Sequence, residues 1–208
     1  MEAILNFDLS VFSFIEQHIW ADWLNPIMVF FTHWGDSGIF WILLSLIFLI
    51  TKKYRKVGFA MIGALLVMEV GNNLILKELI ARPRPFNLLA DWEGIKNMPE
   101  LAAKWASEYN YPDLISRPSS WSFPSGHTSA GFAAATALTL AVKKARFAVP
   151  AYIIAAIIGF TRIYVHVHYC TDVLGGVVVG IIYGIIGFVI VNAICKAIDK
   201  KRAKKNAA

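Results

Sequence analysis

Hydrophobic residues along this chain gather into long runs that short polar or charged segments separate. Five runs are long enough to cross a bilayer as helices, at roughly 26–50, 57–80, 126–142, 147–166 and 170–195. Gly35 and Asp36 interrupt the first run, so a count of six spanning helices stays open. The pattern predicts an all-α, polytopic membrane helix bundle of five to six transmembrane helices, with residues 1–208 forming one integral membrane domain.

The N-terminal segment 1–25 has a different pattern. Over about residues 8–20, apolar side chains recur at helical spacing with polar ones between them, at Phe12, Ile15 and Ile19. Such alternation is typical of an amphipathic helix that lies in the membrane interface rather than across the bilayer. We therefore expect an N-terminal interfacial helix.

The longest segment without a spanning run is 86–123. It mixes charged residues with aromatic ones, namely Trp92, Trp105, Tyr109, Tyr111 and Trp121. A loop of this composition either caps a site that faces the lipid or simply rests at the interface. The pattern alone does not separate these two interpretations.

Composition supports the membrane class, because 57% of the residues are hydrophobic and only 16% are charged. The net charge of +6 is concentrated after the apolar runs, in basic clusters at 52–56, 143–146 and 196–205. Basic segments of this kind are retained in the cytoplasm, so we expect a cytoplasmic C-terminal tail (196–208) and an outer 86–123 loop in a cell membrane. No basic stripe interleaved with aromatics is present in the sequence, so nucleic acid is not an expected partner.

The last hydrophobic run carries glycines at four-residue spacing, Gly176, Gly180 and Gly184. Small residues on one helix face let another helix approach closely in lipid. The stripe predicts either tight packing inside the bundle or a homodimer contact.

Three distant fragments carry charged groups that are costly beside a bilayer and therefore suggest a function. In the first, Lys77 and Arg84 lie where a helix reaches the outer surface. Arg binds phosphate oxygens with two parallel hydrogen bonds and Lys adds a compact charge, although either could instead reach toward lipid head groups.

The second fragment is Pro-Ser-Gly-His at 124–127, directly before a hydrophobic run. Ser125 is placed to cap that helix, and a helix start with free N–H groups is an anion site.

Arg162, His168 and Asp172 form the third fragment. On a helix, His168 and Asp172 would share a face because they are four residues apart. A carboxylate bonded to one imidazole nitrogen leaves the other nitrogen free to attack an electrophile. By topology, all three fragments lie on the same outer side, which favours one shared site.

Together the fragments resemble the three-part signature of the type 2 phosphatidic acid phosphatase family, which is related to bacterial acid phosphatases and vanadium haloperoxidases. In this chain they read KELIARPRP (77–85), PSGH (124–127) and TRIYVHVHYCTD (161–172). Thr161 stands where the family usually has Ser, so the hydroxyl is kept. The resemblance implies that the phosphate ligands are Lys77, Arg84, Ser125, Gly126 and Arg162.

The same resemblance implies that His168 attacks phosphorus, Asp172 orients it and His127 protonates the leaving oxygen. No cofactor and no metal are expected, because the cations already fill the electrostatic role. The expected function is metal-independent hydrolysis of a membrane lipid phosphate or diphosphate through a phosphohistidine, at the outer face of the bilayer. Undecaprenyl diphosphate, phosphatidylglycerophosphate and phosphatidic acid are the candidate substrates.

Two alternative functions use the same residues. A lipid-phosphate binding or transport protein would keep the anion site without turnover. A vanadate-dependent haloperoxidase would use the constellation for oxidation, which the membrane setting disfavours.

Overall fold

The structure is a computed structural model that describes residues 2–91, 93–109 and 111–206. Helices make up nearly all of its regular structure, and no strand occurs in those ranges. The all-α prediction is therefore confirmed for the part of the chain that is described.

The chain begins with α1 (Glu2–His18), which is longer than the predicted 8–20 segment. A loop leads to α2 (Asn25–Trp34), the short 3-10 turn η1 (Asp36–Gly38) and α3 (Ile39–Ile50). The axes of α2 and the following helix differ by 47°, so the first apolar run is broken where its sequence predicted an interruption.

A basic turn, η2 (Lys52–Tyr54), connects to α4 (Arg55–Met68). The helix continues as a π-helical stretch, η3 (Glu69–Leu76), and ends with α5 (Lys77–Ile80). A π stretch inside a long helix is rare and frequently lies at a functional site.

The predicted loop 86–123 is partly helical. It contains η4 (Pro85–Asn87), α6 (Leu88–Asp91), η5 (Glu93–Asn97) and α7 (Pro99–Glu108), followed by an irregular stretch up to α8. Trp105 of α7 is buried with Phe12 of α1 in one aromatic cluster, and Tyr109 and Tyr111 pack against it, whereas Trp121 is exposed. Trp92 of the same segment lies outside the described residues.

The remaining helices are α8 (Gly126–Val142), α9 (Ala145–Tyr164) and α10 (Cys170–Asn206). α8 runs through the middle of the bundle and is rich in buried Ala, Ser and Thr. The glycine stripe of α10 faces it: a Cβ atom at Gly180 would lie 2.7 Å from the Ser129 carbonyl oxygen, and one at Gly184 would lie 2.5 Å from Cβ of Thr136. Of the two interpretations of the stripe, packing inside the bundle therefore has direct support.

Three helical stretches are long and apolar enough to cross a membrane, namely 52–90, 145–164 and 170–206, and the bent pair 25–34 and 36–50 makes a fourth. The predicted span 126–142 corresponds to α8, which has 17 residues and is mostly buried among its neighbours. The chain is a multi-pass membrane protein with three to four candidate spans by length and composition.

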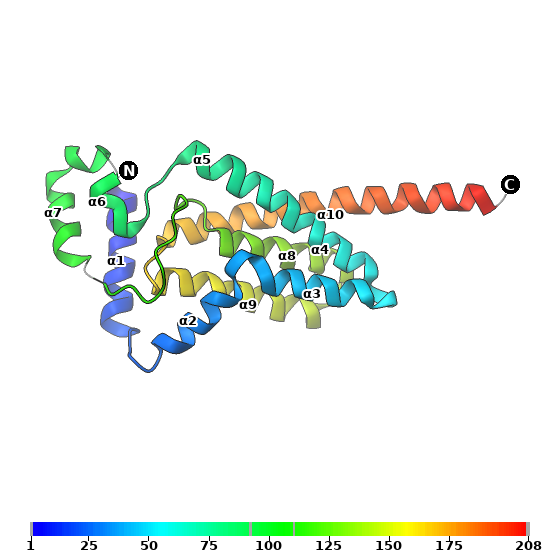
Figure 1. Ribbon diagram of the computed structural model, residues 1–208, viewed down its shortest axis with the longest axis horizontal. Coiled ribbons are helices and arrows are strands. Elements are labelled where there is room, and N and C mark those ends of the chain that lie inside the picture. Colours follow the sequence, from blue (N-terminus) through cyan, green and yellow to red (C-terminus); the bar gives the residue numbers. More distant parts are fainter. Residues whose placement is uncertain (1, 92, 110, 207–208) are drawn as a thin grey trace.

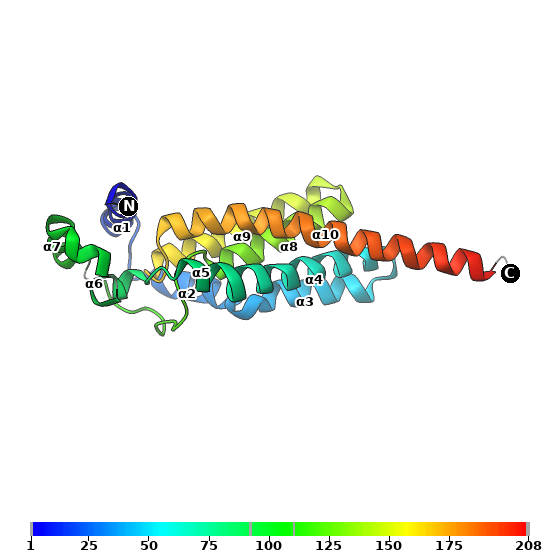
Figure 2. The ribbon, with the colours of Figure 1, turned by 90° about the horizontal axis from the view of Figure 1, so that it is seen from above.

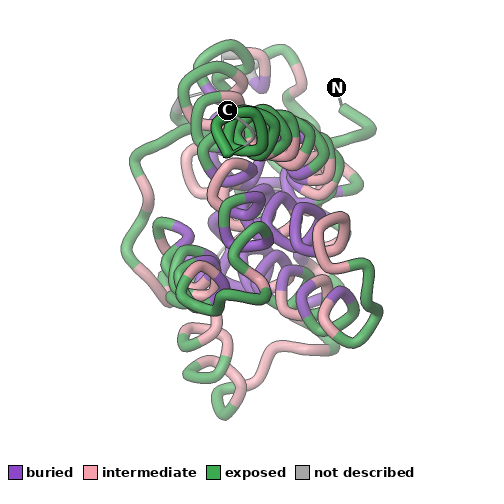
Figure 3. Tube along the Cα trace, turned by 90° about the vertical axis from the view of Figure 1, so that its right-hand side faces the viewer, coloured by how far each residue is buried: buried purple, intermediate pink, exposed green. Residues whose placement is uncertain are grey.

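The bundle has two chemically different ends. In both side views α1, α6 and α7 gather at one end, whereas α10 projects far beyond the other (Figures 1 and 2). The junctions η2 and 143–144 lie at that second end, beside the start of the α10 projection. Seen end-on, buried positions fill the centre of the bundle and the projecting turns of α10 are exposed (Figure 3). The basic clusters are thus separated from the three chemical fragments by the length of the bundle.

Candidate active site

The three sequence fragments meet at one cavity of about 930 Å³ near the end of the bundle that carries α1. Most of the predicted site residues line it: Lys77, Arg84, Gly126, His127, Arg162 and His168. Ser125 and Asp172 do not line the cavity but lie buried directly behind it. The structure therefore brings the whole predicted set together.

Arg84 fixes the tautomer of the His168 imidazole. Its guanidinium Nη1 lies 3.2 Å from Nε2 of His168 and also donates to the Val167 carbonyl oxygen at 2.7 Å. Because a guanidinium only donates hydrogen bonds, Nε2 must present its lone pair and Nδ1 must carry the hydrogen. The tautomer is therefore the one that a nucleophilic Nε2 requires.

Asp172 and Ser122 hold the other side of the ring. Nδ1 of His168 lies 3.4 Å from Oδ2 of Asp172 and 3.5 Å from the Ser122 hydroxyl, which itself donates to Oδ2 of Asp172. The expected pairing occurs, but not for the expected reason. His168 lies in the loop before α10 and Asp172 in its first turn, so a bend rather than a shared helix face brings them together.

His168 is almost completely buried among cations. Burial, together with the charges of Arg84, Arg162 and Lys77, holds the pKa of its imidazole well below the ordinary value. The ring is consequently neutral at physiological pH, which is the form that can attack phosphorus.

The remaining cations are held in place by hydroxyl groups. Lys77 Nζ donates to the Ser120 hydroxyl at 3.3 Å, and Nη1 of Arg162 donates to Thr32 Oγ1 at 2.5 Å. Nε of Arg162 is buried and has no hydrogen-bond partner among the described residues. A buried donor without a partner is costly, so this N–H is available to an anion in the cavity.

At the start of α8, Ser125 occupies the N-cap position, but its side chain does not cap the helix. Its hydroxyl instead accepts a hydrogen bond from Thr128 at 3.0 Å, and the prediction of a serine cap was wrong in this respect. The first N–H groups of α8 are therefore left without that side-chain acceptor, as an anion site requires. A Cβ atom at Gly126 would lie 3.8 Å from Lys77 Nζ, which shows how closely the lysine approaches this helix start.

The bend between α2 and α3 contributes residues that sequence reasoning missed. Asp36 accepts from Nε2 of His127 at 2.9 Å with one oxygen and lies 2.7 Å from Nδ1 of His33 with the other. Gly35 packs so closely that a Cβ atom there would lie 2.4 Å from the His127 ring. The only signal in the sequence was the interruption of the first run at these positions.

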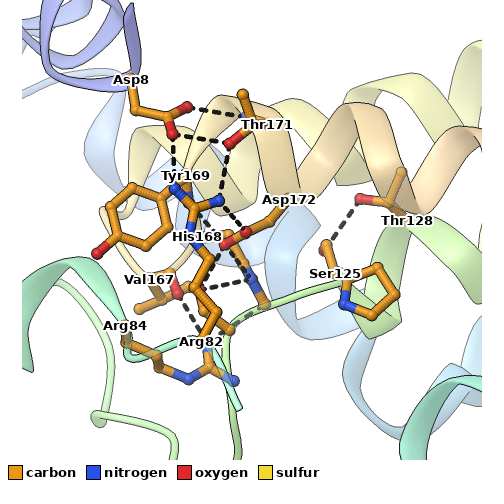
Figure 4. A network of polar contacts seen from close by, with 12 residues as sticks. Asp8, Arg82, Arg84, Ser125, Thr128, Val167, His168, Tyr169, Thr171 and Asp172 are labelled. Carbon is orange, nitrogen blue, oxygen red and sulfur yellow. Dashed lines mark hydrogen bonds and ion pairs between the residues drawn. The ribbon is translucent and has the colours of Figure 1, made fainter. Parts of the chain in front are cut away.

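Arg82, the third cation of the first fragment, points away from the cavity. It donates to Asp172 Oδ1 at 2.6 Å and to Asp8 Oδ2 at 2.8 Å, and its guanidinium lies over the Tyr169 ring at 3.8 Å (Figure 4). Asp8 also accepts from the backbone N–H and the hydroxyl of Thr171. α1 is thereby attached, through a fully buried carboxylate and Arg82, to Asp172, which lies beside His168.

His166 does not line the cavity. Its ring stacks on Tyr111 with centroids 3.9 Å apart and is surrounded by further aromatic rings. Burial lowers the pKa of this imidazole to about 3. It belongs to the packing that supports the loop 165–169, which carries His168.

One cavity of this membrane helix bundle combines a buried imidazole of fixed tautomer, a second histidine paired to a carboxylate, and three cations. Together these groups define a phosphate-handling site. Residues 53–195 match the family model described as the PAP2 superfamily. The chain belongs to this family, and it is a phosphatase.

Known proteins similar to this chain have the same class of activity. An undecaprenyl-diphosphatase of Sulfolobus acidocaldarius is 28% identical over 84% of this chain and 74% of its own length. Phosphatidylglycerophosphatase B of Bacillus subtilis is 32% identical over 74% of this chain and 68% of its own length. The crystal structure of a transmembrane PAP2-type phosphatidylglycerolphosphate phosphatase from Bacillus subtilis has a TM-score of 0.61 at 25% identity, covering 95% of this chain and 85% of that one.

Proposed function

We propose that this enzyme hydrolyses the phosphate monoester or diphosphate of a membrane lipid through a phosphohistidine at His168, without a metal ion. The observation that carries the proposal is the contact between Arg84 Nη1 and His168 Nε2, because it presents a neutral nucleophile beside a cation that can hold the phosphate. A protein that only bound or transported lipid phosphates would have no need of a fixed tautomer, and the enzyme class agrees with turnover.

The reaction proceeds in two displacements. Nε2 of His168 forms a bond to phosphorus while the bond from phosphorus to the leaving oxygen breaks, and Lys77, Arg84 and Arg162 stabilise the charge on the transferred oxygens. His127 gives a proton to the leaving oxygen. Water then attacks the phosphohistidine, gives its proton to His127, and releases phosphate with His168 restored.

The lipid nature of the substrate is supported by the walls of the cavity. Beyond the cations, its lining continues over Ile42 of α3 and over Ile62, Leu65 and Leu66 of α4. Ile42 and Leu66 are exposed where the bundle would meet lipid. A head group can therefore reach the cations while its hydrocarbon chain stays on an apolar surface. Undecaprenyl diphosphate, phosphatidylglycerophosphate and phosphatidic acid are the candidate substrates.

The separation of charges along the bundle supports one membrane orientation. Basic clusters gather at one end, with Lys56 paired to Asp199 at 3.0 Å, and the cavity lies toward the other. The positive-inside rule then assigns the cavity to the outer face of the cell membrane and the end of α10 to the cytoplasm. In this orientation the bundle spans the bilayer five to six times, with α8 as an additional span and α1 at the outer interface.

The test is phosphate release in detergent with EDTA present, on undecaprenyl diphosphate, phosphatidylglycerophosphate and phosphatidic acid. We expect turnover of at least one lipid, its loss in His168→Ala, and an acid-labile phosphoenzyme after rapid quenching that is absent from this variant. The control is Glu78→Ala, because Glu78 is an exposed residue of α5 that does not line the cavity. Full activity in His168→Ala, or dependence on added metal, would refute the mechanism.

A further inference from the structure

Glu69 is a carboxylate in an unexpected place. It lies inside the candidate span 52–90, at the point where α4 becomes the π-helical stretch η3, and it is exposed on the wall of the cavity. Ionisable groups within a span are expensive and mark functional sites. None of the three phosphate-binding fragments includes this residue.

Hydrogen bonds hold the Glu69 side chain in position. Asn73 Nδ2 donates to Glu69 Oε2 at 2.7 Å, and Asn73 Oδ1 accepts from Asn72 at 3.2 Å. Buried Asn72 in turn accepts from Ser129 of α8 at 3.0 Å. The carboxylate is thus connected, one side chain at a time, to the helix that begins at the phosphate site. Such a fixed network suits recognition of a ligand group at a defined place.

The position of Glu69 relative to the phosphate follows from Gly126. A Cβ atom at Gly126 would lie 3.5 Å from Asn73 Oδ1 and 3.8 Å from Lys77 Nζ, so these two side chains meet over the start of α8. Glu69 is the next group beyond Asn73. Farther along the cavity the lining becomes apolar, at Ile62 and Leu66. The carboxylate therefore lies between the phosphate ligands and the hydrocarbon surface.

We propose that Glu69 binds a hydroxyl group on the carbon next to the phosphate-bearing carbon of the lipid. A carboxylate has about four acceptor sites and Asn73 uses one of them, so acceptor capacity remains for a donor in the cavity. A neutral hydroxyl suits the place better than an ammonium group, which the nearby cations Lys77, Arg84 and Arg162 would repel. The preferred substrate is then a glycerol-type phosphomonoester whose hydroxyl on that carbon is free, rather than one in which it is acylated or a phosphate on an uninterrupted hydrocarbon chain. This inference rests on the proposed lipid phosphatase function.

A matched pair of substrates tests the inference. One is 1-acylglycerol 3-phosphate, and the other is its 2-deoxy analogue with the same acyl chain, so that membrane partitioning is equal. We expect wild-type kcat/KM to favour the hydroxyl-bearing lipid by roughly tenfold to hundredfold, as a hydrogen bond to a charged acceptor allows. In Glu69→Ala this ratio should fall close to one, mainly through loss of activity on the hydroxyl-bearing lipid.

Two further variants complete the design. Glu69→Gln keeps the shape and one acceptor oxygen, so its ratio should lie between those of wild type and Glu69→Ala even where the alanine variant folds poorly. Glu78→Ala should leave the ratio unchanged, because Glu78 does not line the cavity. Equal use of both lipids by the wild type, or equal loss on both in Glu69→Ala, would overturn the inference while leaving the phosphatase function intact. If the enzyme hydrolysed neither lipid of the matched pair and none of the three candidate lipids, both this inference and the proposed phosphatase function would be overturned.

Discussion

Asp36 Oδ1 lies 2.9 Å from Nε2 of His127, and the two residues are 91 positions apart in the chain. Because an ionised carboxylate only accepts, Nε2 of His127 carries a hydrogen and Nδ1 is left to exchange a proton with the substrate. Burial of the ring disfavours the imidazolium form, and the carboxylate offsets part of that effect, which the general acid of the proposed mechanism requires. In the proposed mechanism, Asp36 is therefore a positioning residue for the proton-transfer step.

Replacing this carboxylate should slow catalysis without preventing substrate binding. In Asp36→Asn we expect kcat to fall by about tenfold to a hundredfold, a part of what general acid–base catalysis contributes, while KM changes little. The basic limb of the kcat profile should move to lower pH, since the imidazolium loses its stabilising charge. Steady-state kinetics across pH would measure both effects.

Asp22→Asn is the matched control, because Asp22 is exposed and does not line the cavity. It should behave as the wild type. An Asp36→Asn enzyme with an unchanged pH profile and unchanged kcat would show that the contact with His127 has no part in proton transfer.

The buried cationic setting of His168 predicts the acid limb of activity. In the proposed mechanism the neutral ring is the nucleophile, and its pKa is held well below the ordinary value. As pH falls, the ring therefore stays neutral past the usual histidine value of about 6.5, and kcat/KM should decline only below that pH. In Arg84→Gln, removal of one neighbouring cation should move this limb upward, together with a large loss of kcat/KM. A wild-type limb at or above pH 6.5 would contradict the burial argument.

Much of the site could be predicted from the sequence because its residues stand in short, chemically distinctive fragments. Lys77, His127 and His168 converge as expected once the helices pack, since all three lie at the same end of apolar runs. The sequence marked Asp36 only as an interruption of a run and could not indicate that it, Ser122 or Asp8 contacts the site, because each reaches it through a bend or a distant helix. Such contacts depend on tertiary packing rather than on local spacing.

The fold, like the site, could be predicted from the sequence only in part. Long apolar runs predicted the bundle helices closely, because hydrophobic length is a direct consequence of crossing or filling a bilayer. The helices α6 and α7 inside 86–123 were missed, since their short polar stretches have no strong period. They are stabilised by an aromatic cluster with Phe12 that only the folded chain assembles.

The buried carboxylate of Asp8 should contribute strongly to stability. It pairs with Arg82 and accepts two hydrogen bonds from Thr171, with no exposure to solvent. Asp8→Ala leaves these donors unpaired, so we expect a loss of about 3 kcal/mol in the free energy of unfolding and detachment of α1. Asp113→Ala breaks an exposed ion pair with Arg117 and should cost less than about 1 kcal/mol. Thermal unfolding in detergent would compare them, and equal effects would contradict the assigned role of Asp8.

His166 should make the fold sensitive to acid. Its native pKa of about 3 lies below the ordinary value of about 6.5, so the unfolded chain binds a proton that the native state excludes. Stability is therefore fully present above pH 6.5 and is lost as pH falls toward 3.

His166→Phe keeps the stacking on Tyr111 and removes the titrating group. Because His166 has a positive φ of 55°, the phenylalanine should lower stability by a constant amount at every pH, which leaves the pH dependence as the informative quantity. Between pH 7 and pH 5 the wild type should lose about 2 kcal/mol more than the variant, the amount that follows from one histidine with these two pKa values. Unfolding by denaturant at both pH values measures the difference. Parallel losses in the two proteins would mean that His166 gains a proton without unfolding.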